Sequence, residues 1–407
     1  MPIDFLKKAA FFSLLGVIAS AAFSISFYEI TTVIFILLSM TAFFLDPDKK
    51  LLQRRWVIFF GVYFLANLLS LTQTHYPTDS LKGLLRIARL ILLCFSVIYT
   101  VDSKEKFKKI FLWYLGVAFF IAADGLFQGI AGYEVIRQRA MTKYFEDTGR
   151  ITGTFRHAND FSAYLALTLF LFIGILSEAK NLLLPLKKTI PLFLGFLALL
   201  ASILWTYSRG AWVAVCAAFI LMVVLKRKNI LFLFLLLFVG WMLFLAPPFL
   251  RGRVQSLWDP KNGTIRERKI LMQESFDMLE QSPWLGMGLN TFSDNAPFYK
   301  SKQTRTDVQY THNGYLQMAV ETGIVGLLSF LFLLLYFFAS TAPVLLRRPV
   351  RFLEAGGSAL VFGVLAFLIH SATDTDLHSV LLVGNLWLCM GLAWSASRLA
   401  DEKAFSV

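Results

Sequence analysis

A histidine and several arginines stand out in a chain that is otherwise largely apolar. His312 follows Thr311, a plausible helix N-cap, at the start of a long apolar run. We therefore expect His312 in the first turn of a helix, where the positive end of the helix dipole disfavours imidazolium. A neutral imidazole accepts a proton, so His312 is our candidate general base. The alternative is a structural histidine, which is the commoner role of a lone histidine.

Arg268 lies in a polar stretch that we predict to be an amphipathic helix over residues 264–281. Apolar side chains recur there at helical spacing, at Ile265, Met272, Phe276 and Leu279. Arg268 shares this predicted buried stripe, whereas Arg266 and Lys269 do not. A cation that faces inward must be paired or must bind something, so Arg268 is the strongest candidate for binding an anion.

Further cations occur inside a predicted membrane span. Lys82, Arg86 and Arg89 share one face of a predicted helix, because they are four and three residues apart. Charges inside a span usually face an interior or a ligand, and guanidinium matches phosphate oxygens, so we predict a phosphate site. Snorkelling of the long side chains to the head groups is the alternative, and it suits Lys82 better than Arg89.

Two short connections carry more arginines. Arg209, in TYSRGAW, must lie at the membrane surface, either in the site or as a turn residue near lipid phosphates. Arg150 and Arg156, in GRITGTFRHANDFSAYL, belong either to an anion site or to a solvated loop, and the sequence does not decide between them.

Acidic residues complete the set. Glu321 is an acid inside a predicted span and needs a partner, which indicates a supporting role. The segment IHSATDTDLHS brings His370, Asp374, Asp376 and His378 close together, which is one pattern of a metal site. Such spacing in a short loop is a weak signal, so we expect no metal or other cofactor and favour polar contacts to the active cavity, with Asp374 the first candidate.

The composition indicates a polytopic α-helical membrane protein. The 407 residues are 57% hydrophobic and 16% charged, and 41 are Phe. A soluble domain does not need so much apolar surface, and the continuous, non-alternating apolar runs exclude a β-barrel. The three cysteines lie inside apolar runs without CxxC spacing and are expected to be packing residues.

About twelve apolar runs have the length of a membrane span. They cover residues 9–26, 28–45, 56–72, 81–100, 110–131, 158–177, 190–207, 211–225, 230–247, 314–342, 355–373 and 380–397. The net charge of +13 is concentrated in clusters after every second run, which is the positive-inside pattern and not a signature of nucleic-acid binding. We therefore predict cytoplasmic termini and a site on the outer face.

We predict three parts: nine spans in 1–247, one large outer loop with its amphipathic helix in 248–313, and three spans with a cytoplasmic C-terminus in 314–407. No internal repeat is visible. This lowers the prior for a repeat-built transporter.

Several of these motifs resemble the O-antigen ligase and polymerase superfamily. They are GTFRHANDFSAYL, the SRGAW turn, the Arg268 helix with PWLGMG, and THNGYLQMAVETGIVG. The superfamily contains ligases that load O-antigen onto lipid A–core (WaaL-like), Wzy-type polymerases and O-oligosaccharyltransferases. The resemblance implies a metal-independent glycosyltransferase with a GT-C-type architecture in the bacterial inner membrane. It would move a glycan from undecaprenyl pyrophosphate to an acceptor hydroxyl on the periplasmic side.

The resemblance also implies roles for individual residues. An essential histidine falls at His312, with Asn313 beside it, an essential arginine falls at Arg268, and a further important arginine falls at Arg209. Met272 stands where the superfamily usually has an aromatic residue, although the predicted stripe survives this change.

The first interpretation is a ligase acting on lipid A–core, and a polymerase that extends the growing glycan is close behind. Transfer to a protein hydroxyl is less favoured, because no appended protein-binding domain is visible. A lipid-linked glycan transporter, a different class of protein, explains the cations but not His312.

Overall fold

The computed structural model describes residues 3–145, 148–226, 263–301, 310–347 and 351–401. Helices dominate these residues. The only strands among them are β1 (Thr142–Phe145) and β2 (Thr148–Arg150), which form a small antiparallel pair. The prediction of a helical polytopic protein is confirmed at this level.

The helices follow the predicted apolar runs closely. The first eight are α1 (Ile3–Ser20), α2 (Ile25–Leu45), α3 (Arg55–Ser70), α4 (Pro77–Thr100), α5 (Lys104–Ala131), α6 (Ala158–Leu176), α7 (Leu186–Trp205) and α8 (Arg209–Lys226). The others are α11 (Gly263–Gln281), α12 (Phe292–Tyr299), α13 (Gly314–Leu345), α14 (Phe352–Ser371) and α15 (Val380–Ala400), with short 3-10 turns at Lys50–Gln53 and Asp376–His378. Within the described ranges, 8 helices are long and apolar enough to cross a membrane. The predicted run 230–247 lies outside them.

The boundary between the first two helices differs from the prediction. The first run was predicted to extend to residue 26, but α1 ends at Ser20. The reason is local, because the Ser24 side chain accepts a hydrogen bond from the Phe27 backbone N–H and caps α2. The chain therefore turns over residues 21–24.

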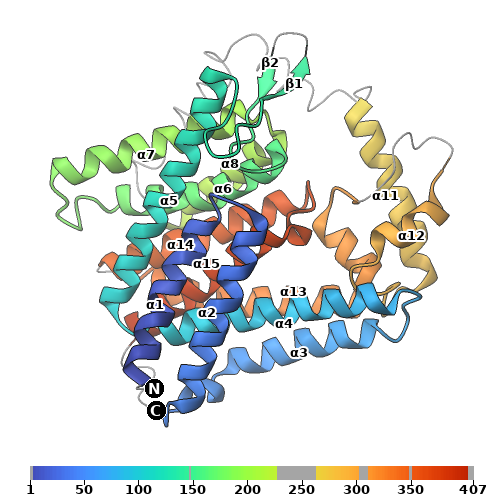
Figure 1. Ribbon diagram of the computed structural model, residues 1–407, viewed down its shortest axis with the longest axis horizontal. Coiled ribbons are helices and arrows are strands. Elements are labelled where there is room, and N and C mark those ends of the chain that lie inside the picture. The colour runs from blue at the N-terminus through green and yellow to red at the C-terminus, as the bar shows by residue number, and fades with distance from the viewer. Residues whose placement is uncertain (1–2, 146–147, 227–262, 302–309, 348–350, 402–407) are drawn as a thin grey trace.

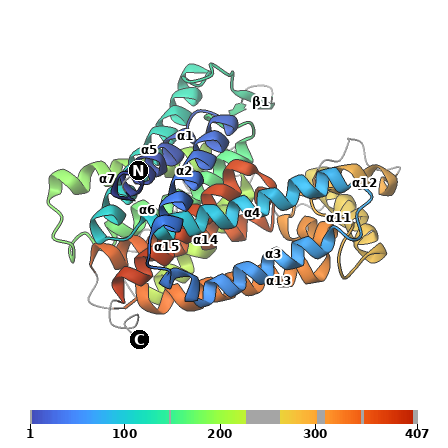
Figure 2. The same ribbon diagram turned by 60° about the horizontal axis from the view of Figure 1, so that its bottom comes forward.

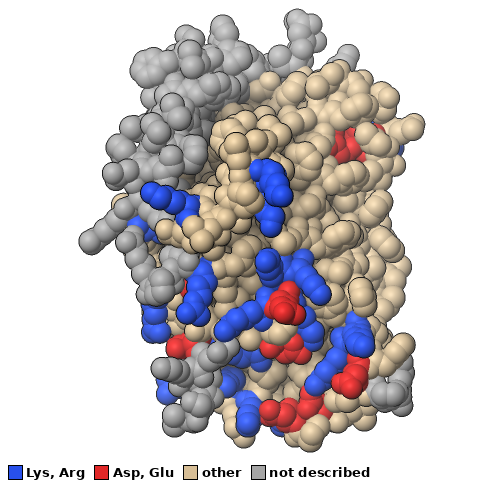
Figure 3. Space-filling view, turned by 90° about the vertical axis from the view of Figure 1, so that its left-hand side faces the viewer, with Lys and Arg blue, Asp and Glu red and all other residues tan. Residues whose placement is uncertain are grey.

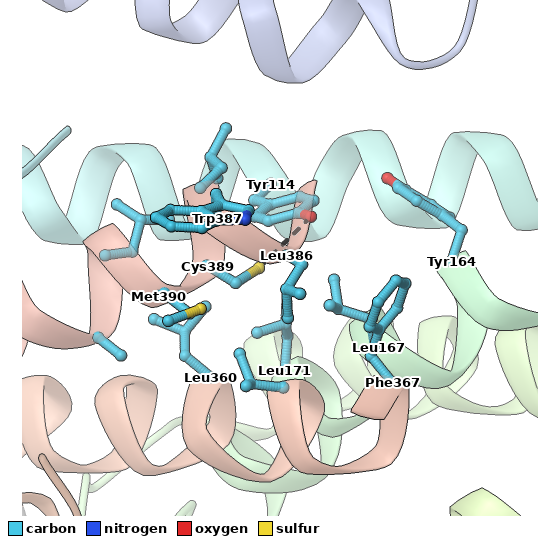
Figure 4. Close-up of a cluster of buried hydrophobic side chains, with 14 of the residues drawn as sticks. Tyr114, Tyr164, Leu167, Leu171, Leu360, Phe367, Leu386, Trp387, Cys389 and Met390 are labelled. Atoms are coloured by element: carbon cyan, nitrogen blue, oxygen red, sulfur yellow. Dashed lines mark hydrogen bonds between the residues drawn. The ribbon is translucent and has the colours of Figure 1, made fainter. Parts of the chain in front are cut away.

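The most buried helices are α6, α14 and α15, which form the centre of the bundle. Helices α6 and α14 approach closely where Gly174 lies against Ala359, and a Cβ at this glycine would be 2.4 Å from that of Ala359. Figure 4 shows the neighbouring cluster, in which the Cys389 thiol faces the Tyr114 hydroxyl at 3.6 Å. Cys94 and Cys389 are buried and none of the three cysteines is in a disulfide, as expected of packing residues.

The segment that carries α11 and α12 lies at one end of the molecule. Figure 1 shows it beside the ends of α3, α4 and α13. Figure 2 shows α11 and α12 at the same end of the molecule from a second direction. In Figure 3, which views the left-hand side of Figure 1, Lys and Arg side chains gather over the lower half of the face. One end of the bundle is thus built from α11 and α12, and a different face carries the basic cluster.

Helix α13 is broken, which the sequence did not predict. Its 32 residues include Gly323 at φ 67°, a left-handed conformation that interrupts the helix. The chain segment 283–288 fills the break. Met287 and Gly288 donate backbone hydrogen bonds to Val320 O (2.9 Å) and Glu321 O (3.0 Å), and Pro283 O accepts one from Ile324 N (2.8 Å). The polar groups freed by the break are therefore paired with this segment.

Candidate active site

Asp374 is the point at which the predicted site residues converge. It lies in the connection between α14 and α15, where its carboxylate contacts His312 (Nδ1 to Oδ1, 3.3 Å) and Arg268 (Nη2 to Oδ2, 3.9 Å). Burial opposes ionisation of Asp374, but the hydrogen bond to His312 and neighbouring cationic groups outweigh it and hold the pKa of this carboxyl well below its usual range. The site therefore places a carboxylate that is ionised near neutral pH between a histidine and an arginine.

His312 lies outside the helix in which it was predicted. The N-cap of α13 is Asn313, whose side-chain oxygen accepts hydrogen bonds from the Tyr315 and Leu316 backbone N–H groups (both 3.1 Å), and Thr311 is not the cap. Asn313 is a better cap than Thr311 here, because its amide oxygen reaches two free N–H groups at once.

The consequence for His312 is a left-handed backbone with φ 53°. A non-glycine residue in this region is uncommon and persists where the surroundings hold it, which is frequent at functional sites. The helix-dipole argument for a neutral imidazole does not apply at this position. The Asp374 carboxylate is the group that orients the ring instead, and it leaves Nε2 directed away from the pair.

Arg268 has the right neighbours, although the predicted buried stripe on its helix is wrong. Met272 and Phe276 are each 44% exposed, whereas Glu274, Ser275 and Met278 are buried. The buried face is rotated because α11 packs its Met278 side against the first turns of α13. Arg268 is half-buried at the edge of this contact, and its Nε is a buried donor without a hydrogen-bond partner. A donor in this state suits an incoming anion.

A chain of hydrogen bonds extends from Asp374 to Arg150. Asn159 Nδ2 donates a hydrogen bond to Asp374 Oδ2, and Asn159 Oδ1 accepts one from Arg150 Nη2 at 2.7 Å. Arg150 also donates to the Thr206 carbonyl at 2.6 Å. Asn159 lies in the first turn of α6, which begins after His157, and it links two parts of the site. Arg156 is exposed in the same connection.

The turn that carries Arg209 packs against the Asp374 connection from another side. A Cβ at Gly210 would lie 2.2 Å from Thr373 Oγ1, so the two segments are in close contact. Beneath them, His370 Nδ1 pairs with Asp376 Oδ2 at 2.6 Å and His370 Nε2 faces Ser208 Oγ at 3.4 Å. Arg209 begins α8 at this contact and is half-buried.

The three cations predicted to share one face of α4 do not converge on Asp374. Lys82 is exposed and pairs with Asp79, and Arg89 pairs with Glu29 at 2.8 Å. Arg86 donates to Asn290 Oδ1 at 3.0 Å and weakly to the His378 carbonyl at 3.4 Å. Each of the three cations has its own protein partner, and a phosphate-binding role for them stays a prediction.

Glu321 has the partners that its burial requires. It is 2% exposed, accepts from the Asn290 backbone N–H at 2.7 Å and from Gln317 at 3.1 Å, and faces His378 Nε2 at 3.5 Å. Arg86, Asn290, Glu321 and His378 line a cavity of about 40 Å³, enough for a few water molecules. This polar network joins Asn290, two residues after the 283–288 segment, to α4, α13 and the turn before α15.

The histidines of IHSATDTDLHS serve two separate contacts. His370 pairs with Asp376 and His378 with Glu321. Over the ranges that the structure describes, no group of three or more His, Cys, Asp and Glu side chains is placed to hold a metal ion. The expectation of a metal-free site stays a prediction.

These features define a polytopic helical membrane protein with a histidine, a carboxylate and arginines gathered at one end of the bundle. Residues 194–331 match a family described as O-antigen ligase. The chain is also 24% identical over 358 residues to the teichuronic acid biosynthesis protein TuaE of Bacillus subtilis (strain 168), covering 84% of this chain and 71% of that protein. It is 25% identical over 325 residues to an O-antigen polymerase of Salmonella muenchen, covering 76% of this chain and 73% of that protein.

The resemblance to the O-antigen ligase and polymerase superfamily is confirmed by these matches. The family match includes Arg209, Arg268 and His312, so it covers the positions where the superfamily's functional residues are expected. The names of the family and of the relatives indicate a membrane glycosyltransferase-like protein of polysaccharide assembly.

Proposed function

We propose that the protein transfers a glycan from a lipid-linked diphosphate to a sugar hydroxyl of an acceptor at the Asp374 site. The observation that carries the proposal is the convergence of His312, Asp374 and Arg268 from three distant parts of the chain. A diphosphate is already a good leaving group, so the reaction needs cations for the departing charge and a base for the acceptor, and this site supplies both.

The proposed step is a direct displacement. His312, oriented through Nδ1 by Asp374, accepts the acceptor's hydroxyl proton at Nε2. The acceptor oxygen forms a bond to the anomeric carbon as the bond from this carbon to the diphosphate oxygen breaks. Undecaprenyl pyrophosphate leaves with the electron pair, held by Arg268 and by Arg209, and the anomeric centre is inverted. No pair of carboxylates of the glycosidase type is required.

Two acceptors are consistent with this chemistry. The family description favours an O-antigen ligase, for which the acceptor is lipid A–core. The relative named O-antigen polymerase is similar over a much longer part of the chain and favours a polymerase, for which the acceptor is another lipid-linked glycan. The donor and the proposed residue roles are the same in both.

We further propose a GT-C-type transferase in the bacterial cytoplasmic membrane with the site on the periplasmic face. The basic clusters between the apolar runs support this orientation, because Lys and Arg are retained on the cytoplasmic side. The donor reaches the site from the surrounding membrane lipids, and α11 and α12 stand over it on the outer side.

The test is transfer by purified protein in the presence of EDTA. Undecaprenyl-pyrophosphate-linked glycan is supplied with and without lipid A–core, and the products are separated on a gel. A shifted lipid A–core band identifies a ligase, and a ladder formed without this acceptor identifies a polymerase. Absence of product in both lanes, restored by added metal, would refute the metal-free mechanism.

A histidine variant separates an enzyme from a transporter. His312→Gln is expected to abolish transfer and to retain binding of the lipid-linked donor, while His75→Gln, which alters an exposed histidine on the α3–α4 connection, is expected to behave as wild type. Full glycan translocation across vesicles by His312→Gln, without transfer by wild type, would support a transporter and reject the proposal.

A further inference from the structure

Trp284 combines an exposed side chain with a firmly held backbone. Its side chain is 67% exposed. Its carbonyl oxygen accepts a hydrogen bond from Val325 N at 3.2 Å, on the far side of the break in α13. The carbonyl oxygen of the preceding Pro283 accepts one from Ile324 N. A large indole presented on a fixed backbone is a candidate contact surface, and its position relative to the membrane decides what it contacts.

The break in α13 marks where this helix enters the membrane. Its 32 residues exceed the roughly 20 that a hydrocarbon core requires. Before the break, Gln317 and Glu321 are polar and buried. From Ile324 to Leu345 there is no charged residue, and this part alone is long enough to span. Gly323 therefore lies at the membrane boundary.

The outward side chains support this boundary. Leu328, Phe332 and Leu335, all beyond the break, are 44%, 53% and 63% exposed, as expected of side chains that face lipid. The Trp284 carbonyl is hydrogen-bonded to Val325 N, which lies at the start of this lipid-facing surface.

Two more helices end at the same level. A Cβ at Gly288 would lie 2.3 Å from Thr74 Oγ1, in the connection between α3 and α4. A Cβ at Gly83, in the second turn of α4, would lie 2.8 Å from Asn290 Cβ, so this part of α4 also lies close to the chain just after the segment. The 283–288 segment is thus packed against the ends of α3, α4 and the spanning part of α13, and it cannot lie far above the bilayer.

We propose that the 283–288 segment is an interfacial anchor, and that Trp284 inserts its indole into the head-group layer of the leaflet on the site side. The partner is the lipid bilayer itself. An indole suits this layer because it combines a large apolar ring with one N–H donor, and tryptophan is enriched there. The inference rests on helix length, burial and backbone bonding, so it stands independently of the proposed transferase activity.

The anchor gives α11 two fixed ends. Its C-terminal end continues into the anchored segment, and Arg268, near the other end, contacts Asp374. The proposed anchor would therefore hold the guanidinium at a set height relative to the lipid head groups.

The test measures the depth of residue 284 in the full chain. Cys94, Cys216 and Cys389 are replaced, and a nitroxide is attached to a single cysteine introduced as Trp284→Cys, Asp277→Cys or Leu335→Cys. Each protein is reconstituted in vesicles of phosphatidylethanolamine and phosphatidylglycerol. Accessibility to oxygen, which concentrates in lipid, is compared with accessibility to a water-soluble nickel chelate. Asp277 is an exposed position on α11, and Leu335 is an exposed position on the span.

We expect the ratio of oxygen to nickel accessibility at residue 284 to be several-fold higher than at 277 and close to, or below, that at 335. A ratio equal to that at 277 would place the side chain in water and overturn the inference. Low access to both reagents would show that protein, such as a second copy of the chain, covers the residue, and this also overturns it.

A second measurement needs no cysteine background. Wild-type protein and Trp284→Phe are reconstituted with brominated lipids, which quench nearby tryptophan fluorescence. The variant should lose a quenched component of the emission. Loss of an unquenched component instead would contradict the proposed insertion.

Discussion

Replacing Asp374 with asparagine tests the site at the point where its contacts meet. The carboxylate accepts hydrogen bonds at both oxygens: Oδ1 faces His312 Nδ1 and the Thr375 backbone N–H (2.9 Å), and Oδ2 accepts from Asn159. Asparagine has only one oxygen. In either orientation its NH₂ group points at a donor, so one side of the site loses its acceptor.

The magnitude follows from these contacts. One buried donor left unpaired costs about 1–3 kcal/mol of unfolding free energy. Transfer activity should fall by about 10²–10⁴-fold, because the variant no longer fixes the orientation of the proposed base and no longer balances Arg268. Asp277→Asn, an exposed carboxylate on α11, is the matched control and should change stability by less than about 0.5 kcal/mol.

The assay combines thermal unfolding in nanodiscs with single-turnover transfer. His312→Gln, Asp374→Asn and the double variant form a cycle. If Asp374 acts through His312, the double variant should transfer no more slowly than His312→Gln alone. Once the base is absent, there is no imidazole left for Asp374 to orient. Full activity of Asp374→Asn, or rate losses that simply multiply in the double variant, would refute this reasoning.

Three further predictions follow from the same structure. Arg268→Lys should reduce transfer about ten- to hundredfold, because an ammonium lacks the planar donor fork, while Arg266→Lys, at an exposed position on α11, should retain activity. Gly323→Ala should lower the unfolding free energy by about 1–3 kcal/mol, because the residue has φ 67° and its Cβ would meet Trp284 O at 2.1 Å, whereas Gly116→Ala, with no atom within 4 Å, should not. The depressed pKa of Asp374 means that its contribution to stability is present above its unfolded pKa and is lost as pH falls through the folded pKa. The stability deficit of Asp374→Asn should therefore stay constant from about pH 8 to pH 5 and shrink only below about pH 4, as measured by unfolding at each pH.

The sequence predicted the helices well because hydropathy is a local property. It placed α6, α14 and α15 within three residues of their observed bounds. The same reasoning singled out His312 and Arg268, since a polar group at the edge of an apolar run is costly without a role.

The details that failed depend on contacts between distant residues. His312 was placed in a helix because Thr311 is an acceptable cap, and only the geometry shows that Asn313 caps better. The buried stripe of α11 was misjudged because α13 covers its Met278 side, which periodicity alone does not reveal. The break at Gly323 also escaped, since a glycine within an apolar run is compatible with a continuous span.

The position of Asp374 between α14 and α15 has a consequence for biogenesis. Arg150, Asn159, Arg268 and His312 all precede it in the chain and are made and inserted earlier. During synthesis these groups are present before the Asp374 carboxylate that they contact. The connection that carries Asp374 is held in place only once α15 packs against α4 and α14. A partly inserted chain consequently has no assembled site. The contacts around Asp374 therefore form only after α15 has been inserted.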